Sequence, residues 1–361
     1  MARIELDHLA HSYAPDAPDP AWALRPIDMV WEDGGTYALL GPSGCGKSTM
    51  LNIISGLLRP SQGRVLFDGR DVTALDTGRR NIAQVFQVPV IYTSMTVAQN
   101  LAFPLVCRKV APAIIRRRVG DIAERLGLAP HLQRRAVGLT ADQKQLVSLG
   151  RGLVREDVSA ILLDEPLTVI DPQMKFELRK ILKQINEEFG ITMVLVTHDQ
   201  NEAMTFARTV VVMNHGEVVQ AGTPQDLFEH PATTHVGYFI GSPAMNFVEA
   251  RLEGGMVRAP ALGLARAAPE GLAGGDLTLG FRPEHLAPDG PGQRIGGRVT
   301  RIWFEGLEEV AEIARNDATF RARVPSGMFR IGDDATFALP DDRLLVYREG
   351  RLCLAGARPA G

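Results

Sequence analysis

Apolar residues in the first part of the chain form short continuous runs that are separated by longer stretches with helical spacing. Three such runs lie at residues 37–40, 160–163 and 192–197, and a helix is predicted over about 173–188. Continuous apolar runs are typical of parallel strands that are covered on both faces. We therefore predict an α/β domain built on a parallel sheet.

The middle of this domain is predicted to be mostly helical. From about residue 95 to 155, apolar residues recur at helical spacing. The residues that show this pattern best are Ile114, Ile115, Val119, Ile122 and Leu126. We predict a helical subdomain over about 95–155, inside a first domain of residues 1–235.

Beyond about residue 236 the pattern changes to short strand candidates that are separated by glycine and proline. Examples lie at 298–304, 318–324 and 335–339. Short alternating strands of this kind are typical of small Greek-key barrels of the OB type. We predict an all-β, OB-like domain over residues 236–361, with ligand binding, dimerisation and regulation as open roles.

The composition limits the class of protein. Of the 361 residues, 45% are hydrophobic and 22% are charged, which is typical of a globular chain with an ample core. The net charge of −3 argues against nucleic acid as a partner, because that binding needs phosphate neutralisation. Cys45, Cys107 and Cys353 are widely spaced, which suits a reducing cytosol. We expect no signal peptide and no membrane-spanning helix, so any membrane role would need a docking partner.

The most specific motif is a glycine-rich segment between the strand at 37–40 and a helix-compatible run at 50–58. In the pattern Gly-x-x-x-x-Gly-Lys-Ser, glycines let backbone N–H groups curl around phosphate oxygens, and the helix adds its positive end. The lysine reaches the β- and γ-phosphates, and the hydroxyl ligates Mg²⁺. A glycine-rich turn before a helix also occurs without a ligand, but the lysine and the hydroxyl favour a nucleoside triphosphate. The residues assigned to the nucleotide are Gly41, Ser43, Gly44, Gly46, Lys47, Ser48 and Thr49.

Two acids follow the buried strand at 160–163. Asp164 is placed to hold Mg²⁺ through water, and Glu165 to act as general base on the attacking water. Paired acids at a strand end often only cap a helix, but the phosphate loop in the same chain favours catalysis. His198 follows the next buried strand, where a γ-phosphate contact and a proton shared with the Glu165 region are predicted. A lone histidine is more often structural.

Two further candidates have weaker signals. Gln87 ends a strand candidate just before Pro89, where its side chain could reach Mg²⁺ or the attacking water. An isolated glutamine is usually only a solvated polar residue. Tyr13 precedes a turn-rich insert and is a candidate stacking platform for adenine, with packing on the sheet as an equal alternative.

The phosphate loop, Gln87, a Leu-x-x-x-Gln helix start, Leu-Leu-Asp-Glu-Pro and Thr-His-Asp, in this order, resemble the ATPase subunit of ABC transporters. The segments 239–247 and 280–285 resemble the joint and the appended domain of the maltose and glycerol-phosphate importer ATPases. The resemblance covers nearly the whole chain. It implies a peripheral ATPase at the cytoplasmic face of the inner membrane, with ATP and Mg²⁺ as cofactors.

The resemblance also implies partners and roles. Two ATPase subunits close head to tail on ATP and drive two integral-membrane permease subunits, which receive solute from an extracytoplasmic solute-binding protein. Carried over by position, the resemblance implies that Tyr13 stacks on adenine and that Lys47 and Ser48 bind phosphate and Mg²⁺. It implies that Asp164 is the Walker B acid, Glu165 the general base and His198 the switch histidine. It also implies that Gln87 binds Mg²⁺ and senses the permease, and that Asp171 contacts the other subunit of the dimer.

The chain departs from the family in the signature motif. The family pattern is Leu-Ser-Gly-Gly-Gln, and this chain has Leu139-Thr140-Ala141-Asp142-Gln143. In the family this segment caps the nucleotide of the opposite subunit through helix N-terminal N–H groups, a contact assigned here to Thr140 and Gln143. Ala141 adds a Cβ where backbone must approach closely. The Asp142 carboxylate would repel a triphosphate by on the order of 3 kcal/mol at about 5 Å and an effective dielectric of about 20. Neutral drift is the alternative.

Because the phosphate-binding side is complete and the signature side is not, we predict a heterodimer with a second, non-identical ATPase subunit whose signature is intact. A soluble ABC protein of translation or DNA repair is one alternative, but those usually carry two cassettes or a long coiled-coil insertion. A poorly hydrolytic regulatory subunit is another; Glu165 and His198 count against it, and Asp142 counts for it. The C-terminal segments favour sugars, polyols, glycerol or glycerol phosphate as solute, with a weak preference for a small polyol such as glycerol.

Overall fold

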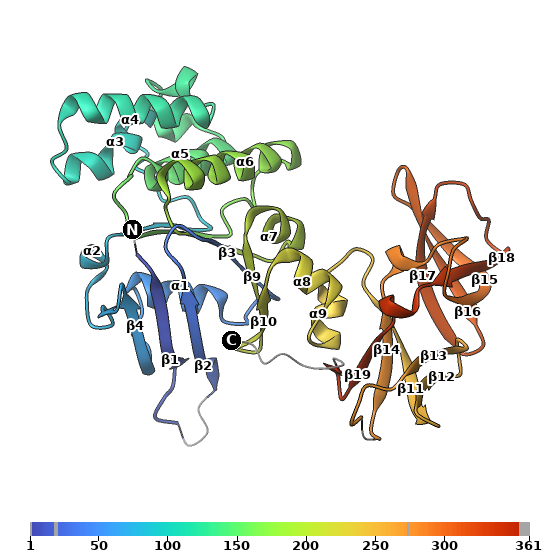
Figure 1. Ribbon diagram of the computed structural model, residues 1–361. Coiled ribbons are helices and arrows are strands. Elements are labelled where there is room, and N and C mark those ends of the chain that lie inside the picture. The colour runs from blue at the N-terminus through green and yellow to red at the C-terminus, as the bar shows by residue number, and fades with distance from the viewer. Residues whose placement is uncertain (1, 18–20, 273, 354–361) are drawn as a thin grey trace. The chain divides into compact units, whose positions relative to one another are not determined.

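The structure is a computed structural model that describes residues 2–17, 21–272 and 274–353 (Figure 1). The chain divides into two compact units, Met1–Pro224 and Gln225–Gly361. The predicted boundary after residue 235 differs from this division because Arg282 binds the segment between the two boundaries. Its guanidinium donates to the Phe228 carbonyl at 2.9 and 3.0 Å and lies 4.2 Å from the centre of the Phe228 ring.

The first unit is built on a six-stranded sheet with the strand order β10-β9-β3-β8-β7-β6. The strands from β9 to β6 are parallel, and β10 is antiparallel to β9. The bounds are Thr36–Leu40 for β3, Ile82–Val85 for β6, Ala160–Asp164 for β7, Met193–Thr197 for β8, Thr209–Asn214 for β9 and Glu217–Gly222 for β10. β3 and β8 are buried along their whole length. The three continuous apolar runs are therefore parallel strands, as predicted.

A second, antiparallel sheet packs in the same unit with the order β2-β1-β4-β5. Its strands are β1 (Ile4–Ser12), β2 (Trp22–Trp31), β4 (Gln62–Phe67) and β5 (Arg70–Asp71). Helix α1 (Lys47–Ser55) shares one hydrophobic core with both sheets, through residues such as Leu51, Trp31 and Leu162. This packing fixes the start of α1 relative to the strand ends.

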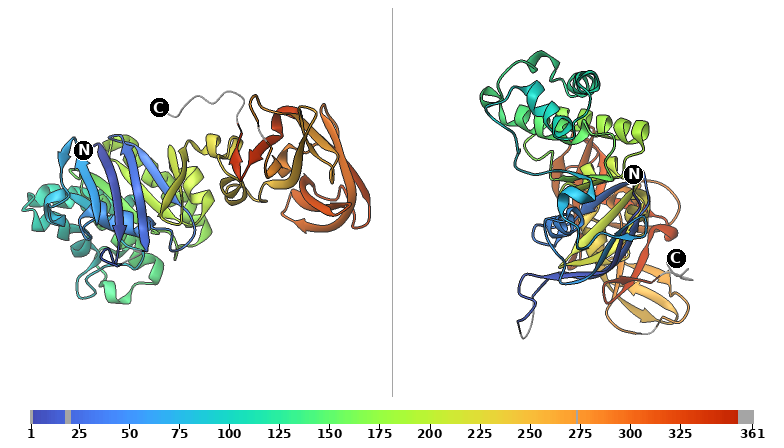
Figure 2. Two further views of the ribbon diagram at one scale, coloured as in Figure 1. Left: turned by 90° about the horizontal axis from the view of Figure 1, so that it is seen from below. Right: turned by 90° about the vertical axis from the view of Figure 1, so that its left-hand side faces the viewer.

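The helices between β6 and β7 gather on one side of the first unit, away from the antiparallel sheet (Figures 1 and 2). Helices lie within the predicted range of about 95–155, and their grouping as a subdomain stays a prediction. Asp171 caps α6, with its Oδ1 accepting from the N–H of Met174 at 3.0 Å; its dimer contact stays a prediction. The helices of the unit are α2 (Thr77–Arg80), α3 (Val97–Cys107), α4 (Pro112–Arg125), η1 (Ala129–His131), η2 (Ala136–Gly138), α5 (Ala141–Leu153), α6 (Pro172–Phe189) and α7 (Gln200–Phe206).

The second unit begins with short helices and continues as two antiparallel sheets. The sheet orders are β13-β12-β11-β14-β19-β20 and β17-β16-β15-β18, and one core joins them through residues such as Phe281, Ile295 and Phe337. The elements are α8 (Pro224–Glu229), α9 (Thr234–Phe239), β11 (Asn246–Glu253), β12 (Met256–Ala259), β13 (Leu264–Ala267), β14 (Leu277–Phe281), η3 (Pro283–His285), β15 (Gln293–Phe304), β16 (Glu308–Arg315), β17 (Ala318–Pro325), β18 (Asp334–Leu339), η4 (Asp341–Arg343), β19 (Leu345–Arg348) and β20 (Arg351–Leu352).

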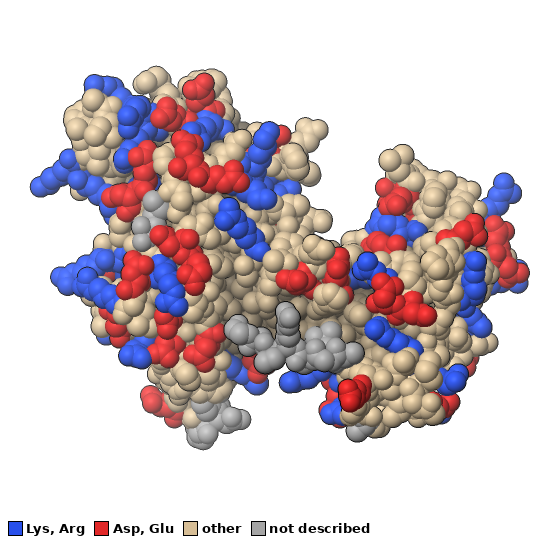
Figure 3. Space-filling model, viewed as in Figure 1, with Lys and Arg blue, Asp and Glu red and all other residues tan. Residues whose placement is uncertain are grey.

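The surface carries charges of both signs. On the face shown in Figure 3, basic and acidic side chains are interspersed on each unit. This distribution agrees with the small net charge of −3. Among the described residues, none of the helices combines the length and the apolar character needed to cross a membrane.

Candidate nucleotide-binding site

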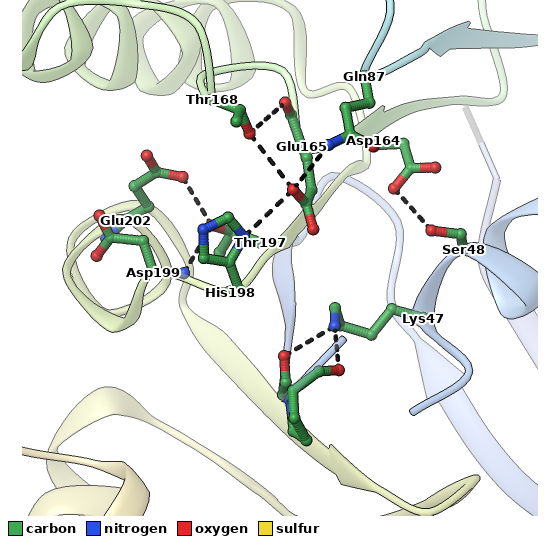
Figure 4. Close-up of polar contacts among 12 residues, drawn as sticks. Lys47, Ser48, Gln87, Asp164, Glu165, Thr168, Thr197, His198, Asp199 and Glu202 are labelled. Carbon is green, nitrogen blue, oxygen red and sulfur yellow. Dashed lines mark hydrogen bonds and ion pairs between the residues drawn. The ribbon is translucent and has the colours of Figure 1, made fainter. Parts of the chain in front are cut away.

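Most of the predicted site residues of the first unit meet at the carboxyl edge of the parallel strands (Figure 4), and Thr140 and Gln143 are the exceptions. The glycine-rich loop follows β3, Asp164 ends β7, and His198 comes directly after β8. Gln87 lies just beyond the end of β6. Because parallel strands present their carboxyl ends at the same edge, residues that are far apart in the sequence come together there.

The loop before α1 has the conformation that close approach to phosphate requires. Gly44 and Gly46 have positive φ values of 80° and 102°. A Cβ at Gly46 would lie 2.5 Å from the carbonyl oxygen of Ala23, and one at Gly41 would lie 2.2 Å from that of Met213. These positions therefore need glycine. The loop leaves the first N–H groups of α1 available to an anion.

Lys47 begins α1, and its ammonium group lies over the same loop. Nζ donates to the carbonyls of Gly41 and Pro42, both at 2.8 Å, and lies 3.7 Å from Sγ of Cys45. An ammonium group has three hydrogens, and the third is directed at Sγ of Cys45. A thiol sulfur is a weak acceptor, so this is the hydrogen bond that a phosphate oxygen can most readily replace. Lys47 is only 5% exposed, and burial strengthens the field of its charge.

Ser48 and Asp164 form a pair of oxygen ligands beside the loop. The Ser48 hydroxyl donates to Oδ1 of Asp164 at 3.1 Å. Burial raises the pKa of Asp164 above its usual value, against the opposing effects of the Ser48 hydrogen bond and the Lys47 charge. Hydroxyl and carboxylate oxygens are the ligands that Mg²⁺ prefers, and a cation would offset the cost of burying this carboxylate. These residues therefore fit the Mg²⁺ ion that the sequence implies.

We expect Asp164→Asn to raise the stability of the nucleotide-free protein and to lower ATP hydrolysis about 100-fold. The pKa of this carboxyl is raised in the folded state, so its ionisation reduces the free energy of unfolding as pH rises through that pKa. The amide has no such penalty. The gain in the free energy of unfolding from Asp164→Asn should thus be larger at neutral pH than at a pH below the pKa of this carboxyl in the unfolded chain. Thermal unfolding across this pH range, with a Mg²⁺-dependent ATPase assay, measures both effects. Equal midpoints at every pH would contradict the stability effect, and unchanged turnover would contradict the Mg²⁺ role.

Glu165 is the next residue, and its backbone is strained. Its φ of 46° lies in the left-handed region that residues other than glycine seldom adopt. Its N–H donates to the carbonyl of Val196 at 3.0 Å. Nε2 of Gln87 lies 3.3 Å from Oε2 of Glu165, and Nδ1 of His198 lies 3.2 Å from the same oxygen (Figure 4). The predicted proximity of His198 to the Glu165 region is therefore present.

A row of polar residues next to His198 was not predicted. The Thr197 hydroxyl donates to Oε2 of Glu202 at 2.7 Å and accepts from the N–H of Asp199 at 3.0 Å. Nζ of Lys175 lies 3.0 Å from Oε1 of Glu202, which is 3% exposed. These contacts brace the turn that carries His198. No sequence motif marks Glu202, because only the fold brings Lys175 to it.

Tyr13 lies on the same cavity. It is 69% exposed, and its hydroxyl lies 3.1 Å from Oγ1 of Thr49. The ring also contacts His11 of β1 edge to face, with the ring centres 4.7 Å apart. Stacking on adenine and packing on the sheet therefore both stay predictions for Tyr13. The cavity has a volume of about 610 Å³, which is in the range of small-molecule sites. It is lined by Tyr13, Ala23, Ser43, Gly44, Gly46, Lys47, Ser48, Thr49, Gln87, Glu165, Thr168 and His198.

Comparison with known proteins identifies the family. The ABC transporter family matches residues 24–168, and the MalK OB fold domain matches residues 241–286. The sn-glycerol-3-phosphate import ATP-binding protein UgpC of Ruegeria pomeroyi is 42% identical over 310 residues, which cover 86% of this chain and 84% of that protein. The chain belongs to the ATP-binding subunits of ABC importers. The protein of the same name from Chromohalobacter salexigens is 44% identical over 287 residues, 79% of this chain and 76% of that one.

Solved structures of ABC ATPases support the fold of this importer subunit. CbiO1 of Clostridium perfringens, part of the ABC transporter complex cbiONQ, has a TM-score of 0.57 at 32% identity and covers 63% of this chain and 90% of its own. A dimeric ATP-binding cassette in a post-hydrolysis state with ADP and Pi has a TM-score of 0.56 at 28% identity, covering 61% and 98%. The predicted ABC-type ATPase with an appended OB-like domain is therefore confirmed, with ATP as its nucleotide.

The segment at 139–143 of this ABC importer subunit lies outside the cavity described above, because Thr140, Asp142 and Gln143 are not among its lining residues. Thr140 precedes α5, and its N–H donates to Oε1 of Gln143 at 3.2 Å. The Thr140 hydroxyl donates to the carboxylate of Asp142, and this bond lowers the pKa of Asp142 below its usual value. Asp142 is therefore ionised at neutral pH. The signature hydroxyl is already engaged by an anion of its own chain.

Proposed function

We propose that the chain is the energy-coupling subunit of an importer for a small carbohydrate or polyol, such as glycerol or glycerol phosphate, and that it pairs with a non-identical ATPase subunit. The relatives named as sn-glycerol-3-phosphate import proteins support the solute class. One observation supports the non-identical partner. The phosphate-binding side of the chain, here called the Walker side, is complete, from the glycine-rich loop to Glu165 and His198. The signature segment of the same chain instead holds an ionised Asp142 that is bonded to Thr140.

On the Walker side, each residue has a separate role. The glycine-rich loop and Lys47 bind the phosphates, and Tyr13 stacks on adenine. Ser48 and Asp164, with Gln87, hold Mg²⁺, which when bound offsets phosphate charge. Glu165 accepts a proton from the water that attacks the γ-phosphorus, and the bond from phosphorus to the ADP oxygen breaks. The leaving phosphate carries the new oxygen. His198, whose Nδ1 lies 3.2 Å from Oε2 of Glu165, would contact the γ-phosphate.

On the signature side, the geometry supports a weak second site. In this family the residues after Leu139 face the γ-phosphate that is bound by the other subunit. Here Asp142 supplies a fixed negative charge, and the Thr140 hydroxyl is committed to that carboxylate. The partner's intact signature would complete the site built on Lys47, and Asp142 would cap the partner's nucleotide. One hydrolytic site and one weak site follow.

The other partners are assigned from the family. Two integral-membrane permease subunits would bind the two ATPase subunits at the cytoplasmic face of the cell membrane, and an extracytoplasmic solute-binding protein would deliver the solute. The second unit, with its OB fold, remains a candidate for dimerisation or regulation. Nucleic acid is not among the proposed partners.

Purification of the complex through a tag on this chain tests the proposed assembly. We expect a second ATPase subunit with a Leu-Ser-Gly-Gly-Gln signature to co-purify with the permeases, and solute-stimulated ATP hydrolysis to need both ATPase subunits. Removal of the second subunit should lower the stimulated rate at least about tenfold. ATP hydrolysis at the full solute-stimulated rate by this chain and the permeases alone would contradict the heterodimer.

Transport assays with glycerol, glycerol phosphate and maltose would test the solute class.

A poorly hydrolytic regulatory subunit is the second candidate function. It is favoured by the charge of Asp142 and by its bond to Thr140. It is opposed by the contacts that join Gln87, Glu165 and His198. Turnover of a Glu165 variant separates the two functions.

A further inference from the structure

We propose that Thr168 is a positioning residue that fixes the general base Glu165. Thr168 lies in the loop between β7 and α6. Its hydroxyl has one hydrogen, which lies within reach of two acceptors on Glu165, the carbonyl oxygen at 3.2 Å and Oε2 at 3.4 Å. This role rests on the proposed function of Glu165 as base, but it does not depend on the heterodimer.

Three donors converge on one oxygen of the Glu165 carboxylate (Figure 4). Oε2 is approached by Nε2 of Gln87 at 3.3 Å, Nδ1 of His198 at 3.2 Å and Oγ1 of Thr168 at 3.4 Å. Within the described part of the chain, no hydrogen-bond donor contacts Oε1. The arrangement pins one oxygen and leaves the other free to accept a proton from water.

Thr168 differs from the other two donors in where it comes from. Gln87 and His198 reach Glu165 from the ends of other strands, and both have proposed duties toward Mg²⁺ or the γ-phosphate. Thr168 belongs to the same loop as Glu165, and its hydroxyl bridges the carbonyl and the carboxylate of that one residue. The bridge also supports the left-handed backbone of Glu165, with its φ of 46°. Thr168 can therefore hold Oε2 while Gln87 and His198 turn toward the nucleotide.

The test is Thr168→Val in the assembled transporter, because valine keeps the branched shape and lacks the hydroxyl. We expect kcat for ATP hydrolysis to fall about tenfold, as for one lost hydrogen bond to a charged group, with KM for ATP within about twofold. Thr168→Ser should restore kcat to within about twofold. Thr205→Val is the matched control, since Thr205 is exposed on α7 and its hydroxyl donates to the carbonyl of Asn201 in the same helix.

A double-mutant cycle distinguishes positioning of the base from a general structural effect. In single-turnover hydrolysis with labelled ATP, Thr168→Val should slow the Glu165→Gln protein by less than about twofold, because the group it positions is already gone. An equal loss in both backgrounds, or an unchanged kcat in Thr168→Val, would overturn the role of Thr168. If Glu165→Gln itself keeps full turnover, the assignment of the base fails instead. Thermal unfolding of each variant, with Thr168→Ala as a second truncation, checks that the fold is intact.

Discussion

ATP hydrolysis by the assembled transporter is expected to fall about 100- to 1,000-fold when Glu165 is replaced by glutamine. The amide keeps the shape of the side chain and its contacts with Gln87 and His198, but it cannot take a proton from water. Lys47 and Ser48 are unchanged, so the dissociation constant for ATP should stay within about twofold. Phosphate release and equilibrium binding of ATP to the purified complex measure the two effects.

Glu187→Gln is the matched control, because Glu187 is an exposed glutamate on α6, away from the cavity. Its turnover should equal that of the unmodified complex. Retention of full turnover by Glu165→Gln would favour the regulatory subunit over the hydrolytic one. A large rise in the dissociation constant for ATP would show instead that Glu165 contributes to binding.

The core of the first unit was predictable because its physics is local. Strands that are buried on both faces must be apolar throughout, so β7 and β8 are visible in the sequence as uninterrupted runs. The carboxyl ends of such strands share one edge, which brings Asp164 and His198 together without further information. The glycine-rich loop could also be predicted from the sequence. Gly46 has a positive φ and lies where a side chain would clash with its neighbours, so this position needs glycine.

Other features depend on contacts that no local pattern encodes. Thr168 lies in a loop to which no motif was assigned, and its role needs the left-handed backbone of Glu165 to bring the hydroxyl to the carboxylate. Glu202 becomes part of the site through Lys175, a residue on another helix. The boundary of the second unit depends on Arg282, whose bonds to α8 and α9 carbonyls appear only in the folded chain.

Changing Ala141 and Asp142 to glycine, as in the family's signature, is expected to strengthen ATP binding by about tenfold or more at the site that we propose to be the weaker of the two. The repulsion between Asp142 and a triphosphate, on the order of 3 kcal/mol at about 5 Å, would be reduced by the solvent around this partly exposed side chain. The glycine at 141 removes a Cβ from the line of approach, and the Thr140 hydroxyl loses its internal acceptor. Two dissociation constants for ATP, measured on the complete complex, report the change.

Asp142→Asn separates the effect of the carboxylate charge on ATP binding from the effect of placing glycine in the backbone. If repulsion is the main cause, the asparagine variant should recover most of the gain at the weaker site, while the dissociation constant of the stronger site, built on Lys47, stays the same. Asp121→Asn, at an exposed acid on α4, controls for the change in net charge. If both signature variants leave the weaker site unaltered, Asp142 does not face the partner's nucleotide. The two sites of the complex would then have to differ for a reason that lies in the other subunit.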